Sequence, residues 1–449
     1  MKKRIRLVSI LILIIFIAIS ISSCSLWNQN GTSGDKTQGN TQNSETPSPE
    51  TSSGTGQNNG NGNPENDNTS LKKVNSLISK MTLEEKIGQL LFIAYRKDAN
   101  DKNVLKMDSY LADILKRYKP GGFVLFSENL DSIDQTVSLI QGIQTQSAIP
   151  LFISIDEEGG IVTRLNKAPL LHSTIMPEAF TIGLTNKPED AYAGAQVIAE
   201  ELLSLGFNMD FAPVADIFTN PENKVIGKRA YGTEPVLAAA MVKEAVKGFC
   251  DQNIIPVLKH FPGHGDTVAD THTGAAAVQH DMDRLMTTEL VPFKEGIEAG
   301  ADAVMVAHIL LPNVTKEPVP ASLSEEIVTG ILRNKLGFDG VVVTDALEMS
   351  AISSYYSDEE AAVKAVQAGV DMLLMPVSVE KTYMALLTAV HNGNLTEERI
   401  DESVRRILLL KDKYRILDNA IERPDPQKTL GSAEHEAVAE KIGKDAQTK

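Results

Sequence analysis

Residues 255–267 read IPVLKHFPGHGDT, and this stretch combines the two features from which the architecture can be inferred. Its first half, Ile255 to Phe261, is a short run rich in apolar residues and predicts a buried strand. Its second half is rich in glycine, proline, histidine and aspartate, so it predicts a loop that carries polar side chains. The same order, a buried strand and then a polar segment, recurs along the chain.

Eight such runs occur between residues 71 and 417, and segments with helical spacing separate them. The runs are Leu90 to Tyr95, Gly121 to Phe126, Pro150 to Asp156, Phe207 to Asp216, Ile255 to Phe261, Ala301 to His308, Gly340 to Asp345 and Val370 to Pro376. The helical segments include Glu189 to Leu205, Glu234 to Gln252, Glu325 to Leu336 and Glu359 to Ala368. Alternation of this kind is typical of a parallel sheet covered on both faces. Eight units favour an α/β fold with one catalytic domain, a TIM (β/α)8 barrel, over an open doubly wound sheet.

The ends of the predicted strands carry polar side chains. The third run ends at Asp156, the fourth at Asp216, the sixth at His308 and the seventh at Asp345. In a barrel, the C-terminal ends of the strands and the loops after them form the active-site face. The sequence therefore predicts that these side chains gather at one rim.

The segment 259–273 holds three of the eight histidines together with two aspartates, namely His260, His264, His272, Asp266 and Asp270. Three interpretations are open, which are a zinc or manganese site, surface histidines in a loop, and a catalytic dyad of Asp270 and His272. The glycines and proline of the segment argue against rigid metal-ligand spacing. In an extended segment residues i and i+2 lie on one side, so Asp270 can orient the imidazole of His272 and stabilise its protonated form. We favour the dyad, because such a pair supplies a proton near neutral pH.

Asp345 follows the apolar run Val341 to Thr344. One interpretation is a structural one, in which Asp345 caps the next helix, because aspartate is a favoured N-cap residue. The other is a nucleophile, because the end of a strand holds a carboxylate firmly at the mouth of a barrel.

The sequence KHFPGHGDT at 259–267, followed by Asp270-Thr271-His272 and later by Thr344-Asp345, resembles glycoside hydrolase family 3. Within that family it is most similar to the β-N-acetylglucosaminidase branch, which trims terminal N-acetylglucosamine from peptidoglycan fragments. The resemblance covers about residues 75–440. It implies a carbohydrate substrate, N-acetylglucosamine-containing muropeptides, and no metal or organic cofactor.

The resemblance also implies a retaining, two-step reaction. Asp345 would attack the anomeric carbon, while His272, held by Asp270, would protonate the leaving oxygen and later activate water. Retaining glycosidases usually use two carboxylates, so a histidine acid is the unusual feature of this branch.

Further positions of this sequence match the family's sugar pocket. Asp156 and Arg164 resemble the pair that grips sugar hydroxyls, and Arg229, Lys259 and His260 resemble the rest of the pocket. Taken singly, each of these residues would more often belong to a structural ion pair. Their assignment therefore depends on the family pattern.

The chain departs from the family pattern at two places. Ile161 lies where relatives commonly carry an arginine after the paired glycines. Leu430 to His435 resembles the lead-in to an α/β sandwich domain, yet the chain ends at Lys449. We interpret 418–449 as a tail, the remnant of a linker to an absent second domain. Either this is a single-domain form or the reading frame is truncated.

The N-terminus is similar to a bacterial lipoprotein signal. Four basic residues precede an apolar run from Leu7 to Ile21, and Ser22-Ser23-Cys24 follows. We expect residues 1–23 to be removed and Cys24 to be acylated, which would anchor the protein at the outer face of the cell membrane. An uncleaved anchor helix is the alternative. Residues 24–70 are rich in Asn, Gly, Ser and Thr and predict a disordered tether before the barrel at 71–417.

Composition excludes some partners and leaves alternative functions open. The formal net charge of −16 disfavours nucleic acid as a partner. Cys250 lies in an apolar stretch and is interpreted as a core residue, and we expect a monomer. The alternatives to the glucosaminidase are a family 3 β-glucosidase, a phosphorylase, and a non-catalytic lipoprotein that binds cell-wall sugar.

Overall fold

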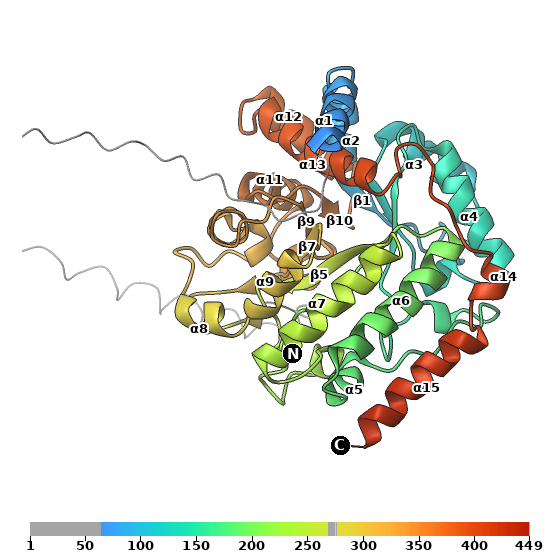
Figure 1. Ribbon diagram of the computed structural model, residues 1–449. Coiled ribbons are helices and arrows are strands. Elements are labelled where there is room, and N and C mark those ends of the chain that lie inside the picture. Colours follow the sequence, from blue (N-terminus) through green and yellow to red (C-terminus); the bar gives the residue numbers. More distant parts are fainter. Residues whose placement is uncertain (1–63, 268–273, 275, 449) are drawn as a thin grey trace, which may run out of the picture. The chain divides into compact units, whose positions relative to one another are not determined.

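The computed structural model describes residues 64–267, 274 and 276–448, and its centre is a sheet of eight parallel strands (Figure 1). The strand order is β10-β1-β2-β3-β4-β5-β7-β9. The strands are β1 Leu91–Ile93, β2 Gly122–Val124, β3 Phe152–Ile155, β4 Met209–Asp210, β5 Ile255–Phe261, β7 Ala303–Val306, β9 Val341–Thr344 and β10 Leu373–Leu374. A parallel bridge between Val343 and Met372 joins the two edges, so the sheet nearly closes. The prediction of a (β/α)8 barrel is confirmed.

The eight strands lie within the eight predicted runs, but β4 is shorter than its run. Regular pairing of β4 ends at Asp210, whereas the run was expected to continue to Asp216. Pro213 interrupts the ladder because proline has no amide proton to donate. Pairing with β5 resumes at a bridge between Val214 and Lys259. Asp216 is thereby placed beside the end of β5.

Helices surround the sheet, and they are α1 Pro64–Ile78, α2 Leu83–Gln89, α3 Ser109–Tyr118, α4 Ile133–Gln146, α5 Ala179–Leu184, α6 Pro188–Leu205, α7 Pro235–Asp251, α8 Met282–Thr287, α9 Val291–Glu298, α10 Ser350–Ser353, α11 Asp358–Ala368, α12 Val379–His391, α13 Glu397–Lys413, α14 Pro426–Thr429 and α15 Ala433–Gln447. The segment Glu326–Lys335 is π-helical, where an α-helix was expected. Two short strands, β6 Ala276–Ala277 and β8 Ile309–Leu310, pair outside the barrel. Among the residues that the structure describes, no helix is both long and apolar enough to cross a membrane.

Local sequence signals set several helix boundaries. Helix α11 begins at a capping box, in which Ser357 and Glu360 each bond to the other's backbone amide. Helix α6 has Pro188 in its first turn and ends at Gly206, whose φ of 108° is easily adopted only by glycine. These caps set where α11 begins and where α6 ends.

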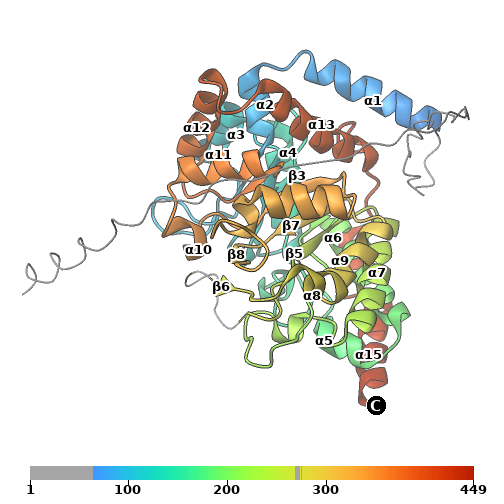
Figure 2. The same ribbon diagram turned by 90° about the vertical axis from the view of Figure 1, so that its left-hand side faces the viewer.

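The C-terminal helix α15 lies beside α5 in both views (Figures 1 and 2). Its Ile442 is fully buried in the core. Lys441 of α15 also forms a 2.7 Å ion pair with Asp190 of α6. Residues 433–447 therefore pack on the barrel's outer helices.

Candidate active site

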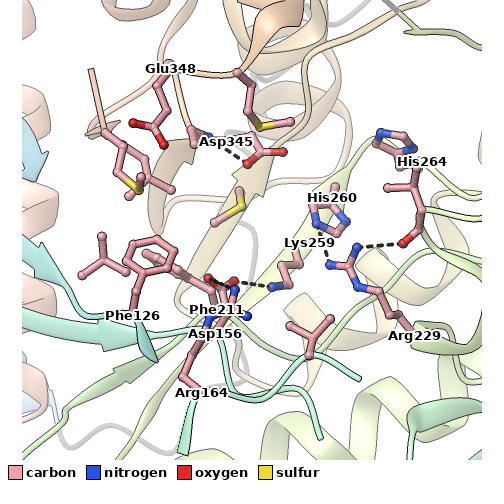
Figure 3. Close-up of a pocket in the computed structure, with 18 of the residues that line it drawn as sticks. Phe126, Asp156, Arg164, Phe211, Arg229, Lys259, His260, His264, Asp345 and Glu348 are labelled. Atoms are coloured by element: carbon pink, nitrogen blue, oxygen red, sulfur yellow. Dashed lines mark hydrogen bonds and ion pairs between the residues drawn. The ribbon is translucent and has the colours of Figure 1, made fainter. Parts of the chain in front are cut away.

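A cavity of about 320 Å³ opens at the C-terminal ends of the strands (Figure 3). Six of the residues predicted from the sequence line it, namely Asp156, Arg164, Arg229, Lys259, His260 and Asp345. They come from segments that are far apart in the chain and that follow β3, β4 and β9 or belong to β5. The barrel therefore brings the predicted sugar pocket and the predicted nucleophile together.

Asp156 directly follows β3 and binds two cations. Its Oδ1 accepts a 2.7 Å hydrogen bond from Lys259 Nζ, and its Oδ2 accepts a 3.2 Å bond from Arg164 Nη2. Burial raises the pKa of Asp156, but the charges of Lys259 and Arg164 outweigh burial, so the net shift is downward. Asp156 is therefore an ionised acceptor whose two cationic partners also face the cavity.

Glu158 is a residue of this site that the sequence analysis did not assign. Its carboxylate accepts bonds from Arg229 Nε at 2.8 Å, from Arg229 Nη2 at 2.7 Å and from Lys259 Nζ at 2.6 Å. Its side chain is only 4% exposed. Burial opposes ionisation, but the two cations lower the pKa of Glu158 below its usual range. The signal was present in the sequence, because Asp156 and Glu158 alternate after a buried strand and alternate residues of an extended chain share a side.

Asp216 holds His260 in place. Its Oδ2 lies 2.7 Å from His260 Nδ1, and Arg229 Nη2 lies 3.3 Å from His260 Nε2. Because a guanidinium only donates, Nε2 must accept, and the proton of a neutral imidazole then lies on Nδ1 toward Asp216. The Asp216 carboxylate also accepts the backbone amides of His260 and His264. The predicted rim residue Asp216 thus orients His260, a residue of the predicted sugar pocket.

Asp345 directly follows β9, and its Oδ1 accepts a 2.7 Å bond from the amide of Ala346. The next helix, α10, has Met349 as its N-cap, so the interpretation of Asp345 as a helix cap is wrong. Burial raises the pKa of Asp345, but His308, His260 and the Ala346 amide outweigh burial and lower it. The group is therefore an ionised carboxylate with a fixed orientation.

Asp270 and His272, the predicted dyad, lie outside the described residues, so their assignment stays a prediction. His260 and His264 are buried and line the cavity, so they are not the surface histidines that one interpretation expected. Among the residues that the structure describes, no group of three or more His, Cys, Asp or Glu side chains could hold a metal ion. That observation leaves the metal interpretation of the loop undecided, because Asp270 and His272 belong to it.

The outer part of the cavity wall has a different composition. Arg96, from the segment after β1, forms a 2.7 Å ion pair with Glu348, and each side chain is more than a third exposed. The guanidinium of Arg96 lies 4.9 Å from the ring centroid of Phe126. Figure 3 shows Glu348 and Asp345 apart from the group of Asp156, Arg164 and Lys259. The cavity therefore has two parts. The inner wall consists of mostly buried charged residues, namely Asp156, Arg164, Arg229 and Lys259, and the outer rim, with Arg96 and Glu348, is more exposed.

Residues 82–410 match the N-terminal domain of glycosyl hydrolase family 3, and the chain belongs to that family. Beta-hexosaminidase A of Pseudoalteromonas piscicida is 35% identical over 392 residues, which are 79% of this chain but 65% of that protein. The structure of a family 3 beta-N-acetylglucosaminidase from a Paenibacillus species is 41% identical, with a TM-score of 0.76, and the match covers 82% of this chain and 69% of that one. The beta-glucoside phosphorylase BglX is 29% identical, also with a TM-score of 0.76, over 83% of this chain and 66% of its own.

Proposed function

We propose that this protein is a retaining exo-β-N-acetylglucosaminidase that acts on peptidoglycan fragments. The observation that carries the proposal is the cavity itself, in which the partly buried carboxylate of Asp345 shares one space with a fixed cluster of charged groups around Asp156. The family membership supports glycoside hydrolysis, and the names of the Pseudoalteromonas and Paenibacillus relatives support a hexosaminidase.

In the first step, an oxygen of Asp345 bonds to the anomeric carbon and the bond from that carbon to the leaving oxygen breaks. Because the pKa of Asp345 is lowered, the nucleophile is ionised at neutral pH. The leaving oxygen takes a proton from His272, held by Asp270. In the second step His272 removes a proton from water, the water oxygen bonds to the anomeric carbon, and Asp345 is released.

The inner wall would bind the terminal sugar. Asp156 accepts hydrogen bonds, and Arg164, Arg229 and Lys259 donate them, so together they match a ring whose hydroxyls do both. Their mutual ion pairs hold these groups in place before the sugar arrives, which lowers the ordering cost of binding. A sugar that leaves one of these buried groups unpaired is penalised.

The direct test is hydrolysis of aryl β-glycosides of N-acetylglucosamine and of glucose by the purified protein, with and without EDTA. We expect a preference for N-acetylglucosamine, no effect of EDTA, and the β-anomer as the first product by NMR. Release of the α-anomer would contradict the retaining mechanism, and equal rates on both sugars would support a β-glucosidase. Loss of activity in EDTA would support the metal site, and inactivity on both would support a sugar-binding lipoprotein.

Phosphorolysis is the second candidate, because BglX is a phosphorylase by name and matches 83% of this chain. A neutral histidine acid would repel phosphate less than a carboxylate acid does. Adding inorganic phosphate to the same assay separates the two reactions. A hydrolase yields free sugar at an unchanged rate, whereas a phosphorylase yields the sugar 1-phosphate at a higher rate.

We also propose that Cys24 is acylated and tethers the enzyme to the outer face of the membrane. The support is the sequence of residues 1–24, which lie outside the described residues. In a bacterial host, the protein should incorporate a labelled fatty acid and sediment with membranes, and Cys24→Ser should abolish both. Labelling of Cys24→Ser at the level of the unmodified protein would contradict this assignment.

A further inference from the structure

Glu201 of α6 binds two segments that are far apart in the chain, and it does not line the cavity. Its carboxylate accepts bonds from the Thr174 amide at 3.1 Å and from Thr174 Oγ1 at 2.6 Å. It also accepts the Gly431 amide at 3.0 Å and lies 3.1 Å from His435 Nδ1. The Glu201 side chain is only 3% exposed. A buried carboxylate thus connects the segment between β3 and α5 to the chain around α15.

The first of these two segments is the Arg164 loop, residues 157–178, which carries Arg164 into the cavity. Hydrogen bonds lead from Thr174 back toward Arg164. Asn166 Nδ2 donates to the Thr174 carbonyl at 3.4 Å, and the Asn166 amide donates to Thr163 Oγ1 at 3.2 Å. The Arg164 amide then donates to Glu157 at 2.7 Å. The position of Thr174 therefore constrains the backbone that presents the guanidinium.

The second segment is the C-terminal segment, residues 426–447, and it touches the loop directly. Gly431 has a φ of 56°, and a Cβ at this position would lie 2.3 Å from the carbonyl oxygen of His172. Glycine is therefore required for the two backbones to approach this closely. One residue later, Ser432 caps α15 by accepting the amide of His435. The cap places the His435 ring against α6.

His435 lies between two carboxylates. Its Nε2 is 3.3 Å from Glu200, and its Nδ1 faces Glu201. Both ring nitrogens donate only when the imidazole is protonated, so this geometry fits the charged form. The hydrogen bond to Glu201 raises the pKa of His435, although burial opposes the shift. The junction is thus a charge-assisted one, which is stronger than a neutral hydrogen bond.

We propose that the C-terminal segment is a positioning element of the sugar pocket, which acts through Glu201 to hold the Arg164 loop in its binding conformation. Glu201 is a positioning residue in this account and not a catalytic one. The inference rests on the proposed function, because it takes Arg164 to bind the terminal sugar. It gives residues 426–447 a role in substrate affinity in addition to packing.

The test compares Glu201→Gln with Asp190→Asn in the full chain. Both residues are buried carboxylates on α6 that bind α15, but Asp190 pairs with Lys441 and forms no hydrogen bond or ion pair with the Arg164 loop, all of which the structure describes. We expect Glu201→Gln to raise KM for the aryl N-acetylglucosaminide by about 10-fold, with kcat per folded molecule nearly unchanged, because a displaced Arg164 weakens uniform binding. Asp190→Asn should leave KM unchanged.

Hydrogen exchange supplies a second readout that does not depend on activity. Amides of residues 163–175 should exchange faster in Glu201→Gln than in the unmodified protein, and Asp190→Asn should not change them. An unchanged KM together with unchanged exchange in this loop would overturn the inference. An equal rise of KM in both variants would also overturn it, because it would indicate general loosening of α15. Inactivity of the unmodified protein would instead count against the proposed function.

Discussion

A buried carboxylate binds cationic side chains at each end of the barrel, Glu158 at the C-terminal end and Asp371 at the N-terminal end. The two clusters differ in the acceptors to which the cations donate their other hydrogen bonds. At the C-terminal end, Glu158 binds Arg229 and Lys259, and both of these cations line the cavity. At the N-terminal end, Asp371 binds Arg333 at 2.6 Å, and Arg333 directs its other donors to backbone carbonyls. The first cluster keeps donors available for a ligand, whereas the second uses them within the fold.

Burial and ion pairing therefore do not by themselves identify a functional site. Asp371 also accepts the Val342 amide at 2.9 Å and Ser403 Oγ at 2.7 Å, so it joins β9, β10 and α13 where the barrel closes. Glu158 and Asp371 are chemically alike, and only the adjoining cavity separates their roles. Substitutions at the two ends should therefore affect different quantities.

The largest effect is expected for Asp345, whose carboxylate faces the cavity and forms no ion pair with the residues that the structure describes. Asp345→Ala should lower kcat by about 10³-fold or more, because the nucleophile is lost. The free energy of unfolding should fall only slightly at neutral pH, since the folded state lowers the pKa of this partly buried carboxylate and so favours its charged form. Initial rates and urea unfolding measure the two quantities. Residual activity within 10-fold of the unmodified enzyme would exclude Asp345 as the nucleophile.

At the N-terminal end of the barrel, which we call the closed end, Asp371→Asn should reduce the free energy of unfolding by about 3–5 kcal/mol, because it leaves Arg333 and two further partly buried arginines without their carboxylate. The kcat/KM of the molecules that remain folded should not change, since the cavity lies at the other end. Urea unfolding and active-site-normalised rates test the two statements. Glu380→Gln is the matched control, because it breaks an exposed pair with Arg117 and should cost less than about 1 kcal/mol.

The sequence predicted the barrel because continuous apolar runs, such as Val341 to Thr344, indicate strands that are buried on both faces of a sheet. Closure could not be predicted in detail, because the bridge between Val343 and Met372 depends on pairing between distant segments. The end of β4 was misplaced, since the run of apolar residues continues through Pro213 although the hydrogen-bond ladder does not.

The sequence predicted residues that line the cavity, but it did not predict Glu158 and Glu201, which hold other residues in place. Asp156 and Asp345 directly follow strands and Lys259 lies near the end of β5, and the active-site face of a barrel brings such residues together. Glu158 was not assigned although its alternation with Asp156 placed it on the same side of the chain, because its partner Arg229 comes from a distant segment. Glu201 lies within a helix and binds His435 of the C-terminal segment, so sequence spacing carries no signal for its contacts.

A smaller effect than that of Asp371→Asn is expected for Glu158→Gln at the C-terminal end of the barrel, which we call the open end. Glu158→Gln should lower kcat/KM by roughly 10- to 100-fold, mainly through KM, because Arg229 and Lys259 lose the group that aligns them for binding. Steady-state kinetics of folded enzyme would show this. Glu178→Gln is the control, because Glu178 pairs with the exposed Lys228 nearby. A drop in stability with an unchanged KM would place Glu158 in the same category as Asp371.

The smallest effect concerns Lys411 at the closed end, whose fully buried amine donates a 2.9 Å bond to Gln89 and lies 5.1 Å from the ring centroid of Phe152. Burial lowers the pKa of Lys411 from 10.5 to about 7. Between those two values the unfolded chain binds more protons than the folded one, so the free energy of unfolding should rise with pH across this window. Lys411→Met should flatten that slope.

At pH 6 the same variant should be more stable by roughly 1–3 kcal/mol, because the buried charge is removed, while the Gln89 oxygen that loses its donor offsets about 1 kcal/mol. The difference should disappear near pH 10, where the folded amine of the unmodified protein is already neutral. Urea unfolding at several pH values measures both. Lys413→Met, at a half-exposed position of the same helix, serves as the control and should keep the original slope. If the free energy of unfolding depended on pH in the same way for Lys411→Met and the unmodified protein, the prediction would be wrong. The buried amine of Lys411 would then be charged and stabilised by its surroundings, as Arg229 and Lys259 are.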